Sequence, residues 1–329
     1  MKKVSFKLMF MIFILIMGIV LIGCNKTLSK KDEAKAEATS VKVIKEADVK
    51  KDEDSGLSFS VLGDVHEDVN NFNEAVDDLY NIDNKQDALI LNGDVVGQGL
   101  DEQYVSMNKA IEANKSKLPK TIIKNIGNHE FFDYRKDRNT QDDVNEFIKR
   151  YLDFSGEDRV YHDKWIEGYH FISLGSESGN TKELGSVKAY LSKEQLKWFE
   201  ETIKEKYEKG KPIFIFLHQH INDSIKGWNG SDQREKVKKI LSKYPEAIIF
   251  TSHTHLPLEK INLSLNNPYT MVHTGAVQYS LVIDNNGKIT RPSYNEGIYV
   301  SVKQNKVTIK GRRFKEHRWI FSKDIEYKK

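Results

Sequence analysis

The sequence predicts an α/β fold, an αββα sandwich in which two mixed β-sheets pack on each other and are flanked by helices. Two observations indicate this architecture. From Leu57 onward, short apolar runs alternate with helical patterns, which is typical of βαβ units and a largely parallel sheet. After His255 no helical pattern separates the apolar runs, so we expect antiparallel strands there, in a second sheet packed on the first.

The elements follow from these patterns in chain order. Short runs rich in apolar and β-branched side chains predict strands at 57–62, 88–91, 121–126, 170–174, 212–217 and 247–250. Helical periodicity predicts helices at 71–79, 102–113, 142–152, 194–207 and 233–242. Ser192 and Gln195 have the spacing of a capping box before the fourth helix, and Gly210 can end that helix. The C-terminal strands are expected at 270–272, 278–282, 297–302 and 306–309.

Residues 1–23 have the composition of a signal peptide. Three lysines precede an apolar run, 8–22, which is followed by Gly23 and Cys24. Cys24 is the only cysteine, so an intramolecular disulfide is excluded. The tetrapeptide from Leu21 to Cys24 resembles the lipobox of bacterial lipoproteins, which implies cleavage before Cys24 and its lipidation. A transmembrane anchor is the alternative, although the apolar run is short for a bilayer span.

Either interpretation predicts a protein at the cell membrane, on its extracytoplasmic face. Residues 24–56 contain the lipidated cysteine and a segment rich in Lys, Asp and Glu, which is expected to be a flexible tether or an isolated charged helix. One domain is expected at 57–322, followed by a C-terminal tail at 323–329. The formal charge of +3 falls to zero when residues 1–23, with their three lysines, are removed. Charge therefore gives no reason to expect a nucleic-acid partner.

Five of the apolar runs end in side chains that commonly bind metals. The five motifs are Asp64-Val65-His66, Gly93-Asp94, Gly127-Asn128-His129-Glu130, His218-Gln219-His220 and His253-Thr254-His255. Because ligands gather at the carboxyl ends of strands in such sheets, we expect these side chains to meet. Asp64 and His66 lie two residues apart, so both project to the same side of an extended strand end. Oxygen and imidazole donors of this kind suit a pair of divalent cations, which indicates metal-assisted phosphoester hydrolysis.

In this order the motifs resemble the calcineurin-like metallophosphoesterase superfamily, whose pattern is Asp-X-His, Gly-Asp, Gly-Asn-His-Glu/Asp, His and Gly-His-X-His. The resemblance runs from Leu57 to His255 and implies a hydrolase with two divalent metal ions, Mn, Fe or Zn. It assigns seven metal ligands: Asp64, His66 and His255 to the first ion, Asn128, His218 and His253 to the second, and Asp94 to both. It also implies that His129 lies near the phosphate as a general acid. Glu130 would orient that imidazole or cap a helix.

Some positions leave alternatives open. Ser252 stands where the family has glycine before His253, which is expected to tighten the turn. His220 could replace His218 as the ligand, although the position directly after an apolar strand favours His218. His273 is a candidate substrate contact. The other histidines are expected to be structural or exposed, namely His162, His170 and His317.

The motif set also resembles bacterial class III cyclic nucleotide phosphodiesterases. This implies a small phosphoester substrate, such as a nucleotide, with a diester favoured over a monoester. The segment 127–134 is similar to the Gly-Asn-His-Glu-Phe-Asp-Tyr segment of secreted nucleotidases, with one phenylalanine inserted. The alternative function is a catalytically silent binding lipoprotein of the cell surface with the same fold. A monomer is expected.

Overall fold

The structure is a computed structural model that describes residues 56–221, 230–260, 263–265, 268–284 and 286–328. All of these residues belong to the compact unit Lys42–Lys329. The predicted signal peptide, the lipidated Cys24 and the charged tether lie outside the described residues. Within the described ranges, no helix is both long enough and apolar enough to cross a membrane.

The first sheet has six strands in the order β14-β13-β12-β1-β2-β3. Its N-terminal strands run parallel to one another and are β1 (Leu57–Leu62), β2 (Ala88–Asn92) and β3 (Thr121–Asn125). Its C-terminal strands form an antiparallel meander of β12 (Glu296–Lys303), β13 (Lys306–Arg313) and β14 (Arg318–Glu326). β1 lies between the two sets, because Phe59 pairs with Ala88 on one side and with Val300 on the other.

The second sheet also has six strands, in the order β4-β5-β6-β7-β9-β8. Its parallel centre consists of β5 (Tyr169–Ser173), β6 (Ile213–Phe216), β7 (Ala247–Thr251) and β9 (Thr270–His273). Its antiparallel edge strands are β4 (His162–Ile166) and β8 (Leu263–Ser264). A separate two-stranded hairpin contains β10 (Val282–Ile283) and β11 (Ile289–Thr290).

The predicted fold class is confirmed, but the predicted division of strands between the sheets is wrong. β12 and β13 extend the first sheet beside β1, and β9 joins the second sheet parallel to β7. Strand pairing at such sequence distances leaves no local signal in the chain. The strand expected at 278–282 is reduced to β10, and β14 runs past the boundary expected at 322. Tyr327 is buried in the core, so the expected C-terminal tail is largely part of the domain.

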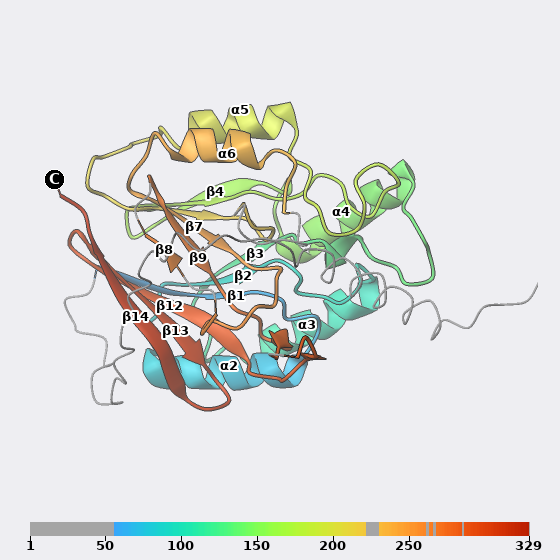
Figure 1. The fold of residues 1–329 in the computed structure, drawn as a ribbon, viewed down its shortest axis with the longest axis horizontal. Coiled ribbons are helices and arrows are strands. Elements are labelled where there is room, and N and C mark those ends of the chain that lie inside the picture. The colour runs from blue at the N-terminus through green and yellow to red at the C-terminus, as the bar shows by residue number, and fades with distance from the viewer. Residues whose placement is uncertain (1–55, 222–229, 261–262, 266–267, 285, 329) are drawn as a thin grey trace, which may run out of the picture. The chain divides into compact units, whose positions relative to one another are not determined.

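Helices cover the outer face of each sheet (Figure 1). The first sheet packs against α2 (Val69–Ile82), α3 (Asp101–Ala113) and α4 (Gln141–Ser155). The second packs against α5 (Lys193–Thr202) and α6 (Arg234–Leu241).

Capping side chains mark the start of α2, α4 and α5. Thr140 and Asp143 form a capping box on α4. Ser192 accepts a hydrogen bond from the Gln195 N–H, but the Gln195 side chain bonds Gly175 and Glu177 rather than completing the predicted box. The expected end of this helix near Gly210 is also wrong, because α5 ends at Thr202.

The space between the sheets is filled by aromatic side chains. The Phe59 ring packs edge-on against Phe171 at 5.0 Å, Phe214 at 4.8 Å and Phe250 at 5.9 Å between ring centroids. Phe214 points into this layer, whereas Ile213 and Ile215 point to the outer helices. This alternation buries both faces of the sheet and fixes its register, because a shift by one residue would exchange the two faces. The carboxyl ends of the parallel strands are thereby held at one edge.

Candidate metal centre

The five motifs follow the parallel strands of both sheets. Asp64 and His66 come after β1, Asp94 after β2, and the 3₁₀ turn η2 (His129–Phe131) follows β3. His218 follows β6, and His253 and His255 follow β7. The backbone is left-handed at five of these positions, with φ of 54° at Asp64, 50° at His66, 50° at Asp94, 72° at His253 and 54° at His255. Such conformations cost roughly 1–3 kcal/mol each in residues other than glycine and cluster at functional sites.

Two glycines allow the loops to approach one another. A Cβ atom at Gly127 would lie 2.2 Å from Asp94 Oδ1, and one at Gly93 would lie 2.6 Å from the His218 ring. Any larger residue would therefore push Asp94 or His218 out of place.

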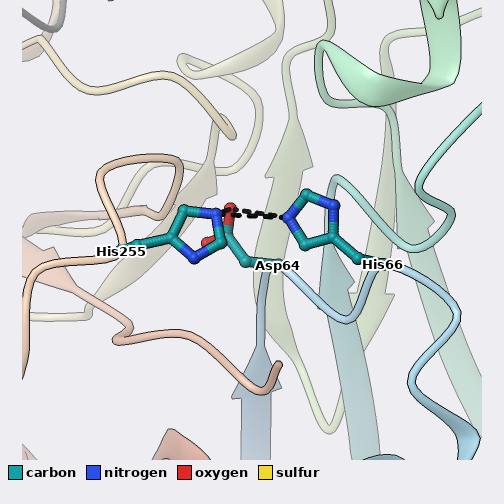
Figure 2. Close-up of side chains that lie close together, drawn as sticks. All are labelled: Asp64, His66 and His255. Carbon is teal, nitrogen blue, oxygen red and sulfur yellow. Dashed lines mark hydrogen bonds and ion pairs between the residues drawn. The ribbon is translucent and has the colours of Figure 1, made fainter. Parts of the chain in front are cut away.

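Asp64, His66 and His255 form the first group of donors. Figure 2 shows the two imidazoles pointing toward each other on either side of the Asp64 side chain at the end of β1, with their Nε2 atoms 3.2 Å apart. Asp64 Oδ1 lies 3.3 Å from His255 Nε2 and 3.8 Å from His66 Nε2. One cation could therefore contact all three side chains.

Asp94, His218 and His253 form the second group. Asp94 Oδ2 lies 3.1 Å from His218 Nε2 and 3.9 Å from His66 Nε2, so this oxygen faces both groups. Asn128 follows β3 and is buried. Within the described part of the chain, its Oδ1 has no hydrogen-bond partner, and neither has Asp64 Oδ1. Unpaired buried oxygens beside this many imidazoles fit divalent cations as the missing partners.

Backbone groups turn the donor atoms toward one another. His218 donates from Nδ1 to the Asn92 carbonyl at 2.8 Å, and His255 donates to the Tyr279 carbonyl at 2.9 Å. Both Nε2 atoms are therefore unprotonated in the neutral rings and directed into the site.

The two carboxylates are held in a similar way. Asp64 Oδ2 accepts the His253 N–H at 3.0 Å, and Asp94 Oδ1 accepts the His129 N–H at 2.8 Å. Each carboxylate thus keeps one oxygen for the site. The bond from His129 occupies Asp94 Oδ1 and leaves Oδ2 to face both donor groups.

Burial and neighbouring charges set the protonation of the donors. Burial alone would raise the pKa values of Asp64 and Asp94, but the histidines outweigh it and lower both. Burial lowers the pKa of His255 and holds that of His253 well below its usual range. For His218, burial is outweighed by Asp94 and Asp64, which raise its pKa to about 9. A proton on His218 thus partly compensates two carboxylates, and a divalent cation would replace it.

His129 lies on the accessible side of the cluster. Its side chain is 22% exposed, whereas the His218 side chain is 0% exposed. Nδ1 donates to the Gly97 carbonyl at 2.9 Å, and Nε2 lies 4.0 Å from Asp94 Oδ2. Burial lowers the pKa of His129 to about 4. With His66 and Asp94 it forms a third group of metal-type donors.

Glu130 does not orient the His129 ring, and the alternative of a helix cap is also wrong. Its buried carboxylate accepts N–H groups of Gly127 at 2.7 Å, Val95 at 2.8 Å and Asp94 at 3.1 Å. Burial, with Asp94 adding to it, raises the pKa of Glu130 to about 7. Glu130 therefore ties the loop after β2 to the loop after β3, an arrangement that depends on backbone donors the sequence does not reveal.

The structure also places His220, His273 and Ser252, for which the sequence left alternatives open. His218, and not His220, belongs to the donor groups found among the described residues. His273 is buried, with Nε2 3.1 Å from the Leu256 carbonyl, which is a structural contact. Ser252 bonds the side chains of Asn92 and Thr274, and its φ is not positive, so serine does not strain the turn.

The remaining histidines make structural contacts or are buried. His170 lies 2.9 Å from Asp163 and stacks on Trp165. His317 contacts Asp78, and His162 is buried.

Two tyrosines beside the cluster were not identified as site residues from the sequence. The Tyr134 hydroxyl lies 3.4 Å from His129 Nδ1, and the Tyr279 ring stacks on His255 at 4.3 Å. Burial raises the pKa of Tyr134 to about 12, and Asp94 and Tyr279 add to the effect. Tyr134 ends the segment 127–134, which was a usable signal, whereas Tyr279 lies outside the motifs.

Comparison with known proteins gives a family match and a fold match. The family profile described as calcineurin-like phosphoesterase matches residues 57–257. In the comparison with curated proteins, none matches the chain. A dimetal phosphatase from Danio rerio has a TM-score of 0.60 and 13% identity, over 84% of this chain and 100% of that one.

Two further solved structures share the fold. A purple acid phosphatase from yellow lupin (Lupinus luteus) seeds has a TM-score of 0.58 and 13% identity, over 82% of this chain and 53% of that one. GAP50 of Plasmodium, described as the anchor in the inner membrane complex, has a TM-score of 0.57 and 11% identity, over 83% of this chain and 89% of that one. At these identities the similarity establishes the fold alone.

Proposed function

Because the chain belongs to the calcineurin-like phosphoesterase family, we propose that it is a dinuclear metal-dependent hydrolase of a small phosphoester, with a diester preferred over a monoester. The observation that carries the proposal is the position of Asp94 Oδ2, which lies 3.1 Å from His218 Nε2 and 3.9 Å from His66 Nε2. A single oxygen facing both donor groups suits two adjacent cations.

The proposed ligands are those already described. Asp64, His66 and His255 would hold one ion, Asn128, His218 and His253 the other, and Asp94 both. Divalent ions bound there supply a Lewis acid for the phosphoryl oxygens and lower the pKa of water. The backbone bonds to Asp64, Asp94, His218 and His255 keep these donors fixed without reorganisation during the reaction.

His129 is proposed to donate a proton to the leaving oxygen. Because its Nδ1–H is bonded to the Gly97 carbonyl, Nε2 carries a proton only when the ring is an imidazolium. Burial disfavours that form and lowers the pKa of His129 to about 4. A bound phosphate adds negative charge beside the ring and shifts the pKa upward, so protonation and substrate binding reinforce each other.

The test is a panel of phosphomonoesters and phosphodiesters, assayed on the full chain in detergent with Mn²⁺, Zn²⁺, Fe²⁺ or Mg²⁺. We expect metal-dependent turnover and about two ions per chain by elemental analysis. A chain that keeps at most one ion and hydrolyses none of the esters would instead be a binding protein, the alternative considered from the sequence.

The proposed location is the extracytoplasmic face of the membrane, with Cys24 as the lipid anchor. It is supported by the charged and apolar pattern of residues 1–23. Cys24→Ala is expected to lose the lipid and to accumulate uncleaved or be released, as followed by fractionation and metabolic labelling with a fatty acid. Normal processing and membrane retention of this variant would contradict the proposal.

A further inference from the structure

A row of neighbouring imidazole rings crosses the candidate metal centre, and a tyrosine contacts it at each end. The Tyr134 hydroxyl contacts His129 Nδ1 at 3.4 Å. The His129 ring lies 4.3 Å from His66, which lies 5.1 Å from His255, and His255 stacks on Tyr279 at 4.3 Å. The two tyrosines therefore border the same cluster, one beside the proposed general acid and one beside a proposed metal ligand.

Tyr134 is unusually exposed for a side chain that touches this cluster. It is 55% exposed, and its backbone N–H is fixed by Gln98 Oε1 at 2.8 Å. The other exposed tyrosines of the described residues are Tyr80, Tyr190 and Tyr207. Among the interactions of the described chain, none of these three contacts a proposed site residue. A half-exposed aromatic ring beside His129 is a surface on which a planar group can stack.

A positive charge stands at the Tyr279 end of the row. The guanidinium carbon of Arg291 lies 5.7 Å from the centre of the Tyr279 ring, and Arg291 is exposed. It directly follows β11, the second strand of the small hairpin. In the described part of the chain Arg291 hydrogen-bonds the Tyr279 side chain but has no ion pair with a carboxylate, so its remaining donors are available to an anion.

We propose that Tyr134 and Arg291 determine substrate specificity, and that the preferred substrate is a phosphoester carrying a planar aromatic ring. The ring stacks on Tyr134, Arg291 contacts a phosphate oxygen, and Tyr279 positions Arg291. This inference rests on the proposed function, because it places the phosphate at the metal centre. It goes beyond that function by naming the group that the enzyme selects.

The test uses two ligands that share a phosphonate and differ in the ring, phenylphosphonate and methylphosphonate. Their carbon–phosphorus bonds exclude simple ester hydrolysis, so calorimetry on the Mn²⁺-loaded full chain measures binding alone. The wild type is expected to bind phenylphosphonate about five- to ten-fold more tightly, which is the range of one aromatic contact. Tyr134→Ala and Tyr134→Leu should bring the ratio of dissociation constants close to one, whereas Tyr134→Phe should keep it.

Arg291→Gln should weaken both ligands by a similar factor of roughly ten, because it removes a charge-assisted contact to the shared phosphonate. Matched controls are Tyr80→Ala, another exposed tyrosine, and Arg159→Gln, another exposed arginine that lies over a tyrosine ring, 4.8 Å from Tyr161. Neither control should change either constant.

Three results would overturn the inference. They are a wild type that binds both phosphonates equally or not at all, an unchanged ratio in Tyr134→Ala, and unchanged affinities in Arg291→Gln. Ring-selective binding without hydrolysis of any ester would refute the proposed function and leave this ligand preference standing. Hydrolysis of esters without ring-selective binding would support the proposed function and refute the roles of Tyr134 and Arg291.

Discussion

Two buried groups of charged side chains in this molecule have different arrangements. Asp78 on α2 accepts two hydrogen bonds from Arg312 on β13, at 2.7 and 2.9 Å, and His317 Nδ1 lies 2.6 Å from the same carboxylate. Both of its oxygens have donors, and its charge is matched by a fixed guanidinium. At the strand ends, Asp64 and Asp94 instead face imidazoles, most of which burial keeps neutral.

The difference separates a structural ion pair from a binding site. A buried pair that neutralises itself holds two elements together and needs nothing from outside. Two carboxylates that converge with mostly neutral imidazoles, and with only the His218 proton to compensate them, are incomplete, and a cation completes them. The following predictions test that distinction, beginning with the largest effect.

Asp94→Asn should abolish turnover, by about 10³- to 10⁴-fold, because a neutral amide cannot share charge between two cations. The domain should stay folded, since the His129 N–H can still bond the amide oxygen. Elemental analysis and steady-state kinetics provide the measurement. Full activity with two ions retained would mean that Asp94 does not connect the two groups.

Asp78→Ala should lower the free energy of unfolding by about 3–5 kcal/mol, because it leaves Arg312 buried without its partner. Turnover per folded molecule should not change, and neither should metal content. The control is Asp78→Leu combined with Arg312→Met, which should recover much of the loss in urea unfolding. A change in metal content with Asp78→Ala would show that the two charge groups are not independent.

His129→Ala should slow alkyl esters by about 10²-fold or more, since protonation of a poor leaving group is lost. Aryl esters with good leaving groups should be affected much less, and the metal content should be unchanged. His253→Ala is the matched comparison, and it should lose metal and slow both kinds of ester together. Equal losses on both esters with loss of metal in His129→Ala would make His129 a ligand.

Removal of metal should destabilise the wild type by about 2.7 kcal/mol for each bound ion when the free ion is otherwise at one hundred times its dissociation constant. The Asp78→Ala variant should show the same difference between chelated and loaded protein, because its ion pair needs no metal. Thermal unfolding with and without a chelator measures this difference. In Asp94→Asn the stability difference between metal-loaded and chelated protein is expected to be smaller than in the wild type. An identical difference would argue against Asp94 as a ligand.

The sequence was sufficient for local features and insufficient for long-range ones. β7 is an almost continuous apolar run, and β1 alternates apolar residues with two serines before ending in Val61 and Leu62. The motifs that follow these strands do converge in the structure, although their ligand roles stay predictions. β14 was missed because it contains Lys323 and Asp324, which interrupt its apolar pattern. The pairing of β12 with β1 has no local signature at all.

Within the site, identities were more predictable than orientations. The donors are recognisable by type and spacing, as in Asp64 and His66. Which oxygen of Asp94 faces the site depends on the His129 N–H, and the partners of Glu130 are backbone groups of two loops. Almost any residue type can donate a backbone N–H, so these hydrogen bonds cannot be predicted from residue types in the sequence.

The position of β1 between β2 and β12 has a consequence for the order of folding. Every proposed metal ligand precedes residue 256, yet one edge of β1 stays open until the strand containing Val300 has been synthesised. During that interval the apolar face that includes Phe59 is incompletely covered, and an open strand edge can pair with another chain. The residues proposed for the chemistry therefore depend on the C-terminal meander, because β12 is made after all of them and closes the open edge of β1, the first strand among the described residues.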